Sequence, residues 1–171
     1  MNQHDPGNKM IPINPFTRVH TTGVAENRLG FPEPFYQAIS PEKKMVLTVK
    51  DRHLVGYQTA IWKLLKENLT TLCPARRDRP GPVRQFLNYA AECWIIPPPE
   101  APETLPPAIA GETRLLEVPP AMISLAQLTT AAVYVGLGYH FEIWSSANWQ
   151  QVKDEVPYKS LGSSNLPDIT A

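Results

Sequence analysis

The segments HLVGY (residues 53–57) and HFEIW (residues 140–144) decide the fold of this chain, because they are two copies of one pattern. A tryptophan follows each copy at the same interval, as Trp62 and Trp149. The copies begin 87 positions apart. A repeat of this length indicates two structural units of one kind. We therefore expect two half-domains that bury one face against each other around a pseudo-twofold axis.

The repeat extends upstream of both segments. A short apolar run precedes each of them, at 46–49 and 133–136, and RLGFP at 28–32 corresponds to RLLEVP at 114–119. The two arginines that open these stretches stand 86 positions apart, one fewer than the other equivalent residues. We attribute the difference to a slip of one position in a turn, and we treat the two arginines as equivalent.

Local patterns predict the elements of each copy. In chain order we expect a strand at 16–20, a loop at 21–27, a strand at 28–31, a helix at 35–39, a hairpin of 46–49 with 54–57, helices at 60–72 and 83–94, a strand at 114–118, a helix at 121–128, a hairpin of 131–135 with 140–144, and a helix at 148–155. The helices at 60–72 and 83–94 form a helical hairpin between the repeats.

These elements divide the chain into six segments. They are a flexible arm at 1–16, a first repeat at 17–62, the helical hairpin at 63–96, a proline-rich insert at 97–108, a second repeat at 109–153 and a flexible tail at 154–171. Proline excludes helix and central strand from the insert. The insert is therefore either a solvated linker or a ligand for a proline-binding module.

Composition limits the class of protein. With 171 residues the chain forms one domain, or two small halves that share a core, because one repeat alone buries too little surface. No apolar run approaches the roughly 20 residues that span a bilayer. The N-terminal stretch 1–9 is polar and lacks the apolar core of a signal peptide. We therefore expect a cytoplasmic protein with no membrane partner.

The net charge of zero hides an asymmetry. Residues 43–84 carry ten basic and three acidic side chains, whereas residues 85–171 carry three basic and nine acidic ones. A surface that binds a polyanion would therefore belong to the first half. The alternative is that these basic side chains only keep helix faces and turns solvated.

Catalytic and metal-binding motifs are missing from the sequence. It has no glycine-rich phosphate loop and no nucleophile elbow. His53 and His140 are equivalent in the repeat, but neither has a metal ligand at suitable spacing, so we interpret them as strand residues. Cys73 and Cys93 also lack such spacing, and we expect reduced thiols, with Cys93 buried and inert on a helix. We expect no enzyme activity, no metal and no cofactor.

Several motifs together resemble the MraZ family of bacterial transcriptional regulators. They are RLxFP at 28–32, a Tyr-x4-Trp pair at 57–62, RxFLxxAAEC at 84–93, RLL at 114–116 followed by PP, and VG at 135–136 leading to FEIW at 141–144. The resemblance covers residues 17 to about 153. It implies two SpoVT-AbrB-like half-domains in one chain. The fold class it implies is α+β, mainly β: a pseudo-twofold β-barrel of interleaved hairpins with short helices.

The resemblance also implies a function and partners. An MraZ-like protein binds double-stranded DNA at tandem repeats in the promoter of a division and cell-wall gene cluster. It does so as a multivalent ring of identical subunits, and is associated with the nucleoid. Two other functions stay open for this chain: an oligomeric protein-interaction scaffold that has lost DNA binding, or an AbrB-type antitoxin that folds around a partner.

The family's DNA-contacting motif is Asp-x-x-x-Arg, once in each half. It corresponds here to VAENR and AGETR, which end at Arg28 and Arg114, while Val24 and Ala110 replace the two aspartates. The resemblance therefore implies Arg28 and Arg114 as DNA contacts; the alternative is a structural role at the start of a strand. An aspartate orients an arginine through paired hydrogen bonds, so these arginines are less preorganised.

Three further residues of these motifs bear on the arginines. Glu26 and Glu112 stand two positions before them and lower the local positive potential, but either could replace the missing aspartate as the orienting acid. Asn27 is suited to the left-handed conformation that a tight turn requires.

A second group of arginines, Arg76, Arg77 and Arg79, provides candidate phosphate contacts, because sequence-independent binding needs only clustered cations. The alternative is a charged surface turn between two helices. The repeated aromatic residues are expected in the core or at a subunit interface rather than as base-stacking platforms. They are Tyr57, Trp62, Trp144 and Trp149.

Overall fold

The computed structural model describes residues 16–39, 41–73, 77, 79–97 and 105–155. The arm and tail predicted at the two ends therefore lie almost wholly outside the described residues, as does the larger part of the proline-rich insert.

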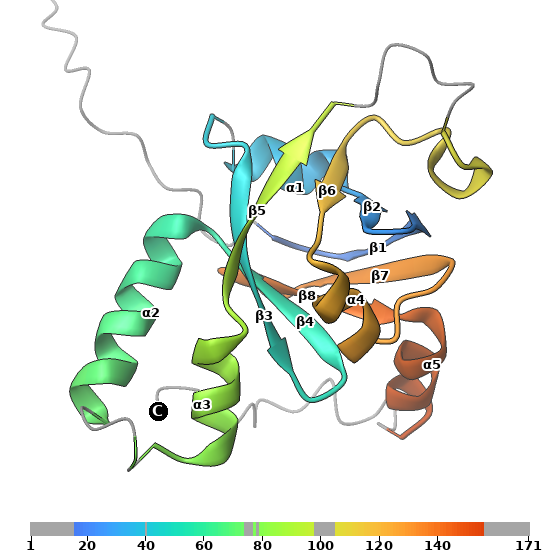
Figure 1. The fold of residues 1–171 in the computed structure, drawn as a ribbon. Coiled ribbons are helices and arrows are strands. Elements are labelled where there is room, and N and C mark those ends of the chain that lie inside the picture. The colour runs from blue at the N-terminus through green and yellow to red at the C-terminus, as the bar shows by residue number, and fades with distance from the viewer. Residues whose placement is uncertain (1–15, 40, 74–76, 78, 98–104, 156–171) are drawn as a thin grey trace, which may run out of the picture.

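Eight strands close into one antiparallel barrel, which confirms the predicted fold class (Figure 1). The first half comprises β1 (Val19–Ala25), β2 (Arg28–Gly30), α1 (Glu33–Ile39), β3 (Lys44–Lys50), β4 (His53–Tyr57) and α2 (Thr59–Leu72). A further helix, α3 (Gly81–Asn88), follows it. The second half comprises β5 (Ala91–Ile96), the short 3-10 helix η3 (Pro107–Ile109), β6 (Leu115–Glu117), α4 (Pro120–Leu125), β7 (Ala131–Gly136), β8 (His140–Ser145) and α5 (Ser146–Glu155).

The two halves are interleaved within the barrel. Its strand order is β1-β2-β6-β5-β3-β4-β8-β7, and exchanging β1–β4 with β5–β8 gives the same closed order. β1 pairs with β7, and β5 pairs with β3, so each half gives its first strand to the hairpin of the other half. Neither half can therefore close a barrel alone.

The pseudo-twofold axis passes through two strand pairs on opposite sides of the barrel. Leu29 lies opposite Leu116 in the β2–β6 pair, and Val55 lies opposite Glu142 in the β4–β8 pair. The partners in both pairs stand 87 positions apart, as the repeat requires. The sequence offset therefore holds without a slip from β2 onward.

This constant offset corrects the predicted equivalence of the two arginines. The Phe31 N–H donates to the Arg114 carbonyl at 2.9 Å, and the Val118 N–H donates to the Asn27 carbonyl at 2.9 Å. The two bonds are related by the axis, so Arg114 is the counterpart of Asn27. Arg28 has a different place in the repeat, and the predicted slip in a turn does not exist.

Residues 21–25, predicted as loop, belong to β1. Thr22 and Val24 are buried while Thr21 is exposed, which is the alternation of a strand with one buried face. The polar composition of this stretch resembles a turn, but its pairing with β7 of the other half makes it a strand. The turn itself comprises only Glu26 and Asn27, because Ala25 already pairs with Arg28.

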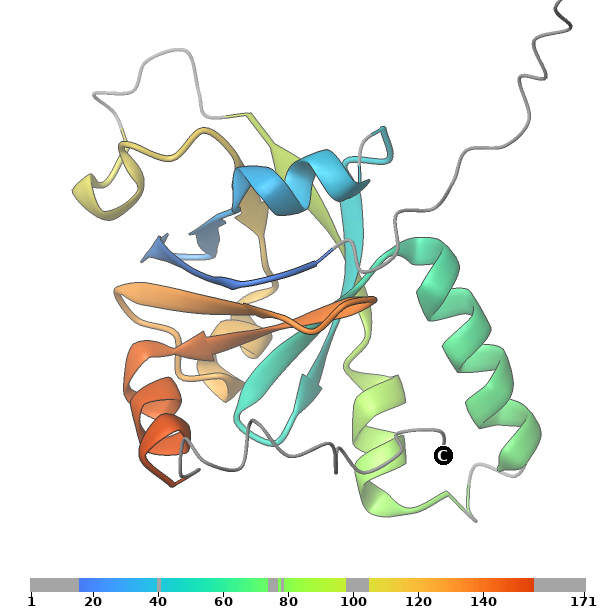
Figure 2. The ribbon, with the colours of Figure 1, turned by 180° about the vertical axis from the view of Figure 1, so that it is seen from behind.

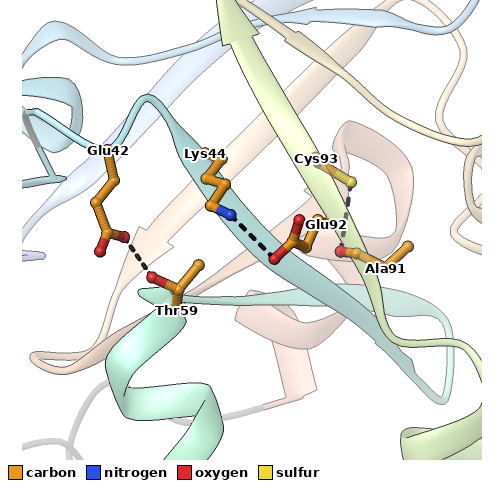
Figure 3. Close-up of polar contacts among 6 residues, drawn as sticks. All are labelled: Glu42, Lys44, Thr59, Ala91, Glu92 and Cys93. Carbon is orange, nitrogen blue, oxygen red and sulfur yellow. Dashed lines mark hydrogen bonds and ion pairs between the residues drawn. The ribbon is translucent and has the colours of Figure 1, made fainter.

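The second predicted helix also ends earlier than expected, at Asn88, and Ala91–Ile96 form β5. Cys93 is buried beside Met45 of β3, whereas its neighbour Trp94 is 53% exposed, again a period of two. Figure 3 shows β5 alongside β3, with the Cys93 thiol donating to the Ala91 carbonyl at 3.7 Å. Cys93 is thus a buried strand residue, and burial raises its pKa to about 12.

The barrel interior is filled by aromatic rings packed edge to face. They are Phe16, Phe31, Phe35, Tyr134 and Phe141, none more than 1% exposed. Burying each such side chain stabilises the fold by about 1.5–3 kcal/mol. The glycine of HLVGY, Gly56, makes room for this cluster, because a Cβ there would lie 2.3 Å from the Phe141 ring.

The helices cover different parts of the barrel. Both views show α2 and α3 side by side on one flank and α5 on the other (Figures 1 and 2). α2 and α5 are related by the axis, since each follows the hairpin of its half. α3 has no counterpart after α5 among the residues described. Within this part of the chain no helix is long and apolar enough to cross a membrane.

Candidate nucleic-acid interface

Arg28 lies on the outer surface of β2, half-buried, directly opposite Glu117 of β6. Side chains directly opposite each other on antiparallel strands share a face of the sheet. In the part of the chain that is described, no hydrogen bond or ion pair holds the Arg28 guanidinium. Arg28 is therefore available to a ligand, but beside a carboxylate.

The surface around Arg28 is acidic and aromatic. The β5–β6 register brings Trp94 next to Glu117, and both line a cavity of about 220 Å³ that also includes Glu92. Lys44 lies 3.1 Å from the Glu92 carboxylate and 5.7 Å from the centre of the Trp94 ring, as Figure 3 shows for the Lys44–Glu92 pair. Nearby acids weaken the attraction of this surface for phosphate.

Arg114 is held by the first helix of the other half. Its guanidinium carbon lies 4.2 Å from the centre of the Tyr36 ring, and its Nε lies 3.8 Å from a Glu33 carboxylate oxygen. Thr113 Oγ1 donates to the same Glu33 oxygen at 3.4 Å. The side chain remains 32% exposed. An arginine stacked on an aromatic face and beside a carboxylate has few alternative rotamers, so Arg114 is preorganised.

The acids that the sequence offered as orienting partners have other roles. Glu112 Oε1 accepts from the Gly23 N–H at 3.1 Å, and its carboxylate packs against Gly30, where a Cβ would lie only 2.2 Å away. Glu26 is exposed in the turn and has φ 55°, a left-handed conformation that costs a residue other than glycine roughly 1 kcal/mol. The left-handed position is thus Glu26, and not Asn27.

The two positions of the missing aspartates also differ. Val24 is 3% exposed and belongs to the core, whereas Ala110 is exposed in the connection before β6. The contacts of Arg114 with Glu33 and Tyr36 were not predicted, because they cross between the halves. The one feature of the sequence that pointed toward these contacts is the constant repeat offset of 87. It makes Arg114 equivalent to Asn27 and not to Arg28.

The candidate phosphate contacts lie elsewhere. Arg76 is outside the described residues. Arg77 is exposed, and Arg79 Nε donates to the Cys73 carbonyl at 2.9 Å, a bond that ties it to the end of α2. The end of α2 and the start of α3 are at the bottom of Figure 1, whereas β2 and β6 are near the top. The structure therefore does not bring the two groups of arginines together.

A third polar group lies on the outer face of β4 and β8, at the pseudo-twofold axis. The His53 ring stacks on Trp144 at 4.0 Å between ring centres, and the symmetry-related His140 ring stacks on Tyr57 at 5.5 Å. Glu142 stands between the two stacks. One of its oxygens lies 3.4 Å from His53 Nε2, and the other accepts from Trp144 Nε1 at 2.7 Å.

Burial and charge both act on this group. Burial raises the pKa of Glu142, but the hydrogen bond and charge of His53, with the bond from Trp144, outweigh it, so that pKa lies below its usual value. Burial lowers the pKa of His140 despite the nearby Glu142. Burial, and then Glu142, raise the pKa of Tyr57 to about 12. Across the described residues no three His, Cys, Asp or Glu side chains gather as a metal site would require.

The sequence is similar to bacterial proteins that share one name. The chain matches no family model. The protein named transcriptional regulator MraZ of Ligilactobacillus salivarius is 28% identical over 132 residues, which are 77% of this chain and 81% of that relative. Its namesake of Lactiplantibacillus plantarum is 28% identical over 77% and 82% of the two chains. That of Roseiflexus castenholzii is 28% identical over 74% and 78%.

Each match covers about three quarters of this chain. Over that length the chain is thus similar, at low identity, to proteins named transcriptional regulator MraZ.

Proposed function

We propose that this protein is a DNA-binding transcriptional regulator. The observation that carries the proposal is its match to three relatives of that name over about three quarters of its length. An exposed and preorganised arginine on the same chain provides a chemically suitable contact, because a guanidinium binds phosphate and guanine through paired hydrogen bonds.

Arg114 is the principal DNA contact in this proposal. Tyr36 and Glu33 already restrict its side chain, so binding costs less conformational entropy than for a free arginine, a difference of about 0.5–1.5 kcal/mol. Arg28 is a weaker contact, because Glu117 shares its surface and no described side chain orients it. One subunit therefore offers a single good contact and one poor contact.

A small contact of this kind requires several copies to act together. We propose that identical subunits assemble into a ring and bind tandem promoter repeats, so that each bound subunit raises the effective concentration of the next. Arg77 and the other basic side chains of 43–84 contribute phosphate contacts that are not specific for sequence. Such a protein acts on the nucleoid.

The test is a titration of fluorescent DNA with the full-length protein at two salt concentrations. The DNA is the region upstream of its own gene with several sequence repeats, the same region reduced to one repeat, and a scrambled control. We expect specific binding that weakens steeply with salt and is at least tenfold tighter for several repeats. Equal binding to all three DNAs would contradict the proposal.

A second function is favoured by the surface around Arg28. Glu92 and Glu117 line the same cavity as the exposed Trp94, a composition that suits a cationic protein partner better than DNA. On this view the chain is an oligomeric interaction scaffold. Replacing Glu117 by Gln discriminates the two: a regulator that uses Arg28 gains DNA affinity, whereas a scaffold shows no DNA binding before or after the change.

A further inference from the structure

We propose that the hollow between α2, α3 and the outer face of β4 and β8 is a binding site for a small organic cation with an apolar body. The proposal does not depend on the two arginine contacts described above, because Arg28 lies on β2 and Arg114 directly precedes β6.

The hollow has the size and lining of a ligand site. Its volume is about 310 Å³, at the lower end of the range for small-molecule pockets, which begins near about 300 Å³. Leu65 and Leu69 line it from α2, and Val83 and Phe86 line it from α3. No described residue of either helix is buried, so a ligand would remove apolar surface of both from water.

α3 creates this site, and no counterpart of α3 follows α5 in the part of the second half that the structure describes. The equivalent place in the second half is lined by Trp144 and Val152, the counterparts of Tyr57 and Leu65. There the hollow measures about 220 Å³, and its other lining residues are mostly polar. They are Asp51, Arg52, Asn148, Gln151 and Glu155. Adding one helix to a symmetrical groove thus produces a single apolar pocket.

The charge of the ligand follows from the floor of the hollow. Glu142 lines it, and its two oxygens face His53 and Trp144, so the carboxylate is held in place and ionised at neutral pH. An anionic ligand would have to lie against this carboxylate. His140 lines the hollow as well, and burial lowers its pKa, which disfavours its charged form there.

Aromatic faces complete the recognition of a cation. Tyr57 and Phe86 line the hollow with their rings at 81° to each other and 6.1 Å between centres. A cation beside such rings is attracted by their negative faces, and the attraction adds to that of the carboxylate. Lys50 lines the hollow from the exposed end of β3, which favours a ligand with one positive charge over one with several.

The test compares three probes of one shape that differ in charge: 3-phenylpropylammonium, 3-phenylpropan-1-ol and 3-phenylpropanoate. Binding to the full-length protein is measured by calorimetry at constant ionic strength. We expect the ammonium to bind about tenfold more tightly than the alcohol, and the carboxylate most weakly. Equal affinity of the three probes, or no binding of any, would overturn the proposal.

A symmetry-related pair of variants locates the site. Leu65→Trp fills the hollow and should abolish binding, whereas Val152→Trp fills its counterpart and should leave binding unchanged. Both positions are half-exposed on helices, so both variants are expected to fold, and circular dichroism checks this. Equal losses in the two variants would refute the assignment. If instead Leu65→Trp dissociates the oligomer and no probe binds, a second copy of the chain occupies the hollow.

Glu142→Gln tests the origin of the charge preference. The amide keeps the shape of the side chain and an oxygen for Trp144, so the alcohol should bind as before. The ammonium should lose its advantage of about tenfold and approach the affinity of the alcohol. An unchanged advantage would show that Glu142 does not recognise the ligand, and would overturn that part of the proposal.

Discussion

The β1–β2 and β5–β6 connections occupy equivalent places in the barrel but are built differently. The first is a turn of two residues, with Glu26 in a left-handed conformation. The second leads from Ile96 to Leu115 and brings Arg114 onto the first helix of the other half. Equivalent strands have thus kept their pairing while the connections have diverged, because exposed connections tolerate insertion and paired strands do not.

The difference changes how each arginine is presented. Arg28 projects from a strand beside Glu117, whereas Arg114 precedes its strand and rests on Tyr36. A match of sequence motifs treats the two as one feature repeated. The fold separates them into Arg28, which has no polar partner among the residues described, and Arg114, which is held by Tyr36 and Glu33.

The largest expected difference is in stability, between variants at the two positions where the motif aspartates are missing, Val24 and Ala110. Val24→Asp places a carboxylate in the core without a partner, and should lower the free energy of unfolding by roughly 3–5 kcal/mol. Ala110→Asp adds an exposed carboxylate and should change it by less than about 0.5 kcal/mol. Urea denaturation of both variants measures the contrast; similar losses would mean that the two connections are more alike than the structure indicates.

The next effect concerns the two arginines. Arg114→Ala should weaken binding to multi-repeat DNA by about 1–3 kcal/mol per contacting subunit, the cost of losing a specific arginine contact. Arg28→Ala should cost under about 1 kcal/mol, and Tyr36→Ala should reproduce part of the Arg114 effect. Fluorescence anisotropy at fixed salt gives all three values. A greater loss for Arg28→Ala would reverse the ranking of the two arginines.

Acid should weaken the fold through the β4–β8 pair, where Glu142 stands opposite an apolar counterpart, Val55. The folded-state pKa of Glu142 lies below its ordinary value of 4.5, so its contribution to stability is complete above pH 4.5 and is lost as the pH falls through the folded value. The lowered pKa of His140 acts in the same direction, beginning below its ordinary value of 6.5. Urea denaturation of Glu142→Gln across this range should show a shallower loss below pH 4.5, and an unchanged slope would contradict the assignment.

The smallest effect tests the β1–β2 turn. Glu26→Gly removes the left-handed strain and should stabilise the protein by about 0.5–1 kcal/mol. Asn27→Gly is the matched control, because Asn27 has no positive φ, and it should be neutral or slightly destabilising. Thermal denaturation compares the stability of the two variants. A larger gain for Asn27→Gly would show that the strained residue is Asn27 and not Glu26.

Sequence patterns predicted the elements whose partners are local. The β3–β4 and β7–β8 hairpins and the helices that follow them agree with the apolar periodicity. The part of β1 after His20 and the whole of β5 were missed, because their pairing crosses between the halves and local composition favours a loop at Thr21 and a helix at Ala91. Long-range pairing overrides local preference at both places.

The candidate site was predicted less completely than the fold. The family motif gave Arg28 and Arg114 but suggested Glu26 or Glu112 as the orienting acid. The acid beside Arg114 is Glu33, and no motif connects the two, because they stand on different halves. Side chains that meet through tertiary packing leave no signal in a single sequence unless the repeat offset is applied strictly.

Because each half contributes its first strand to the hairpin of the other half, β1 is synthesised well before its partner strand β7. Thr21 of β1 pairs with Val133 of β7, so its partner leaves the ribosome 112 residues later. At roughly 5–20 residues per second, the edge of β1 that pairs with β7 remains unpaired for about 5–20 s. A strand with apolar side chains on both faces would invite aggregation during that interval. The threonines of β1, which made it resemble a loop, therefore suit a strand that must wait in water for its partner.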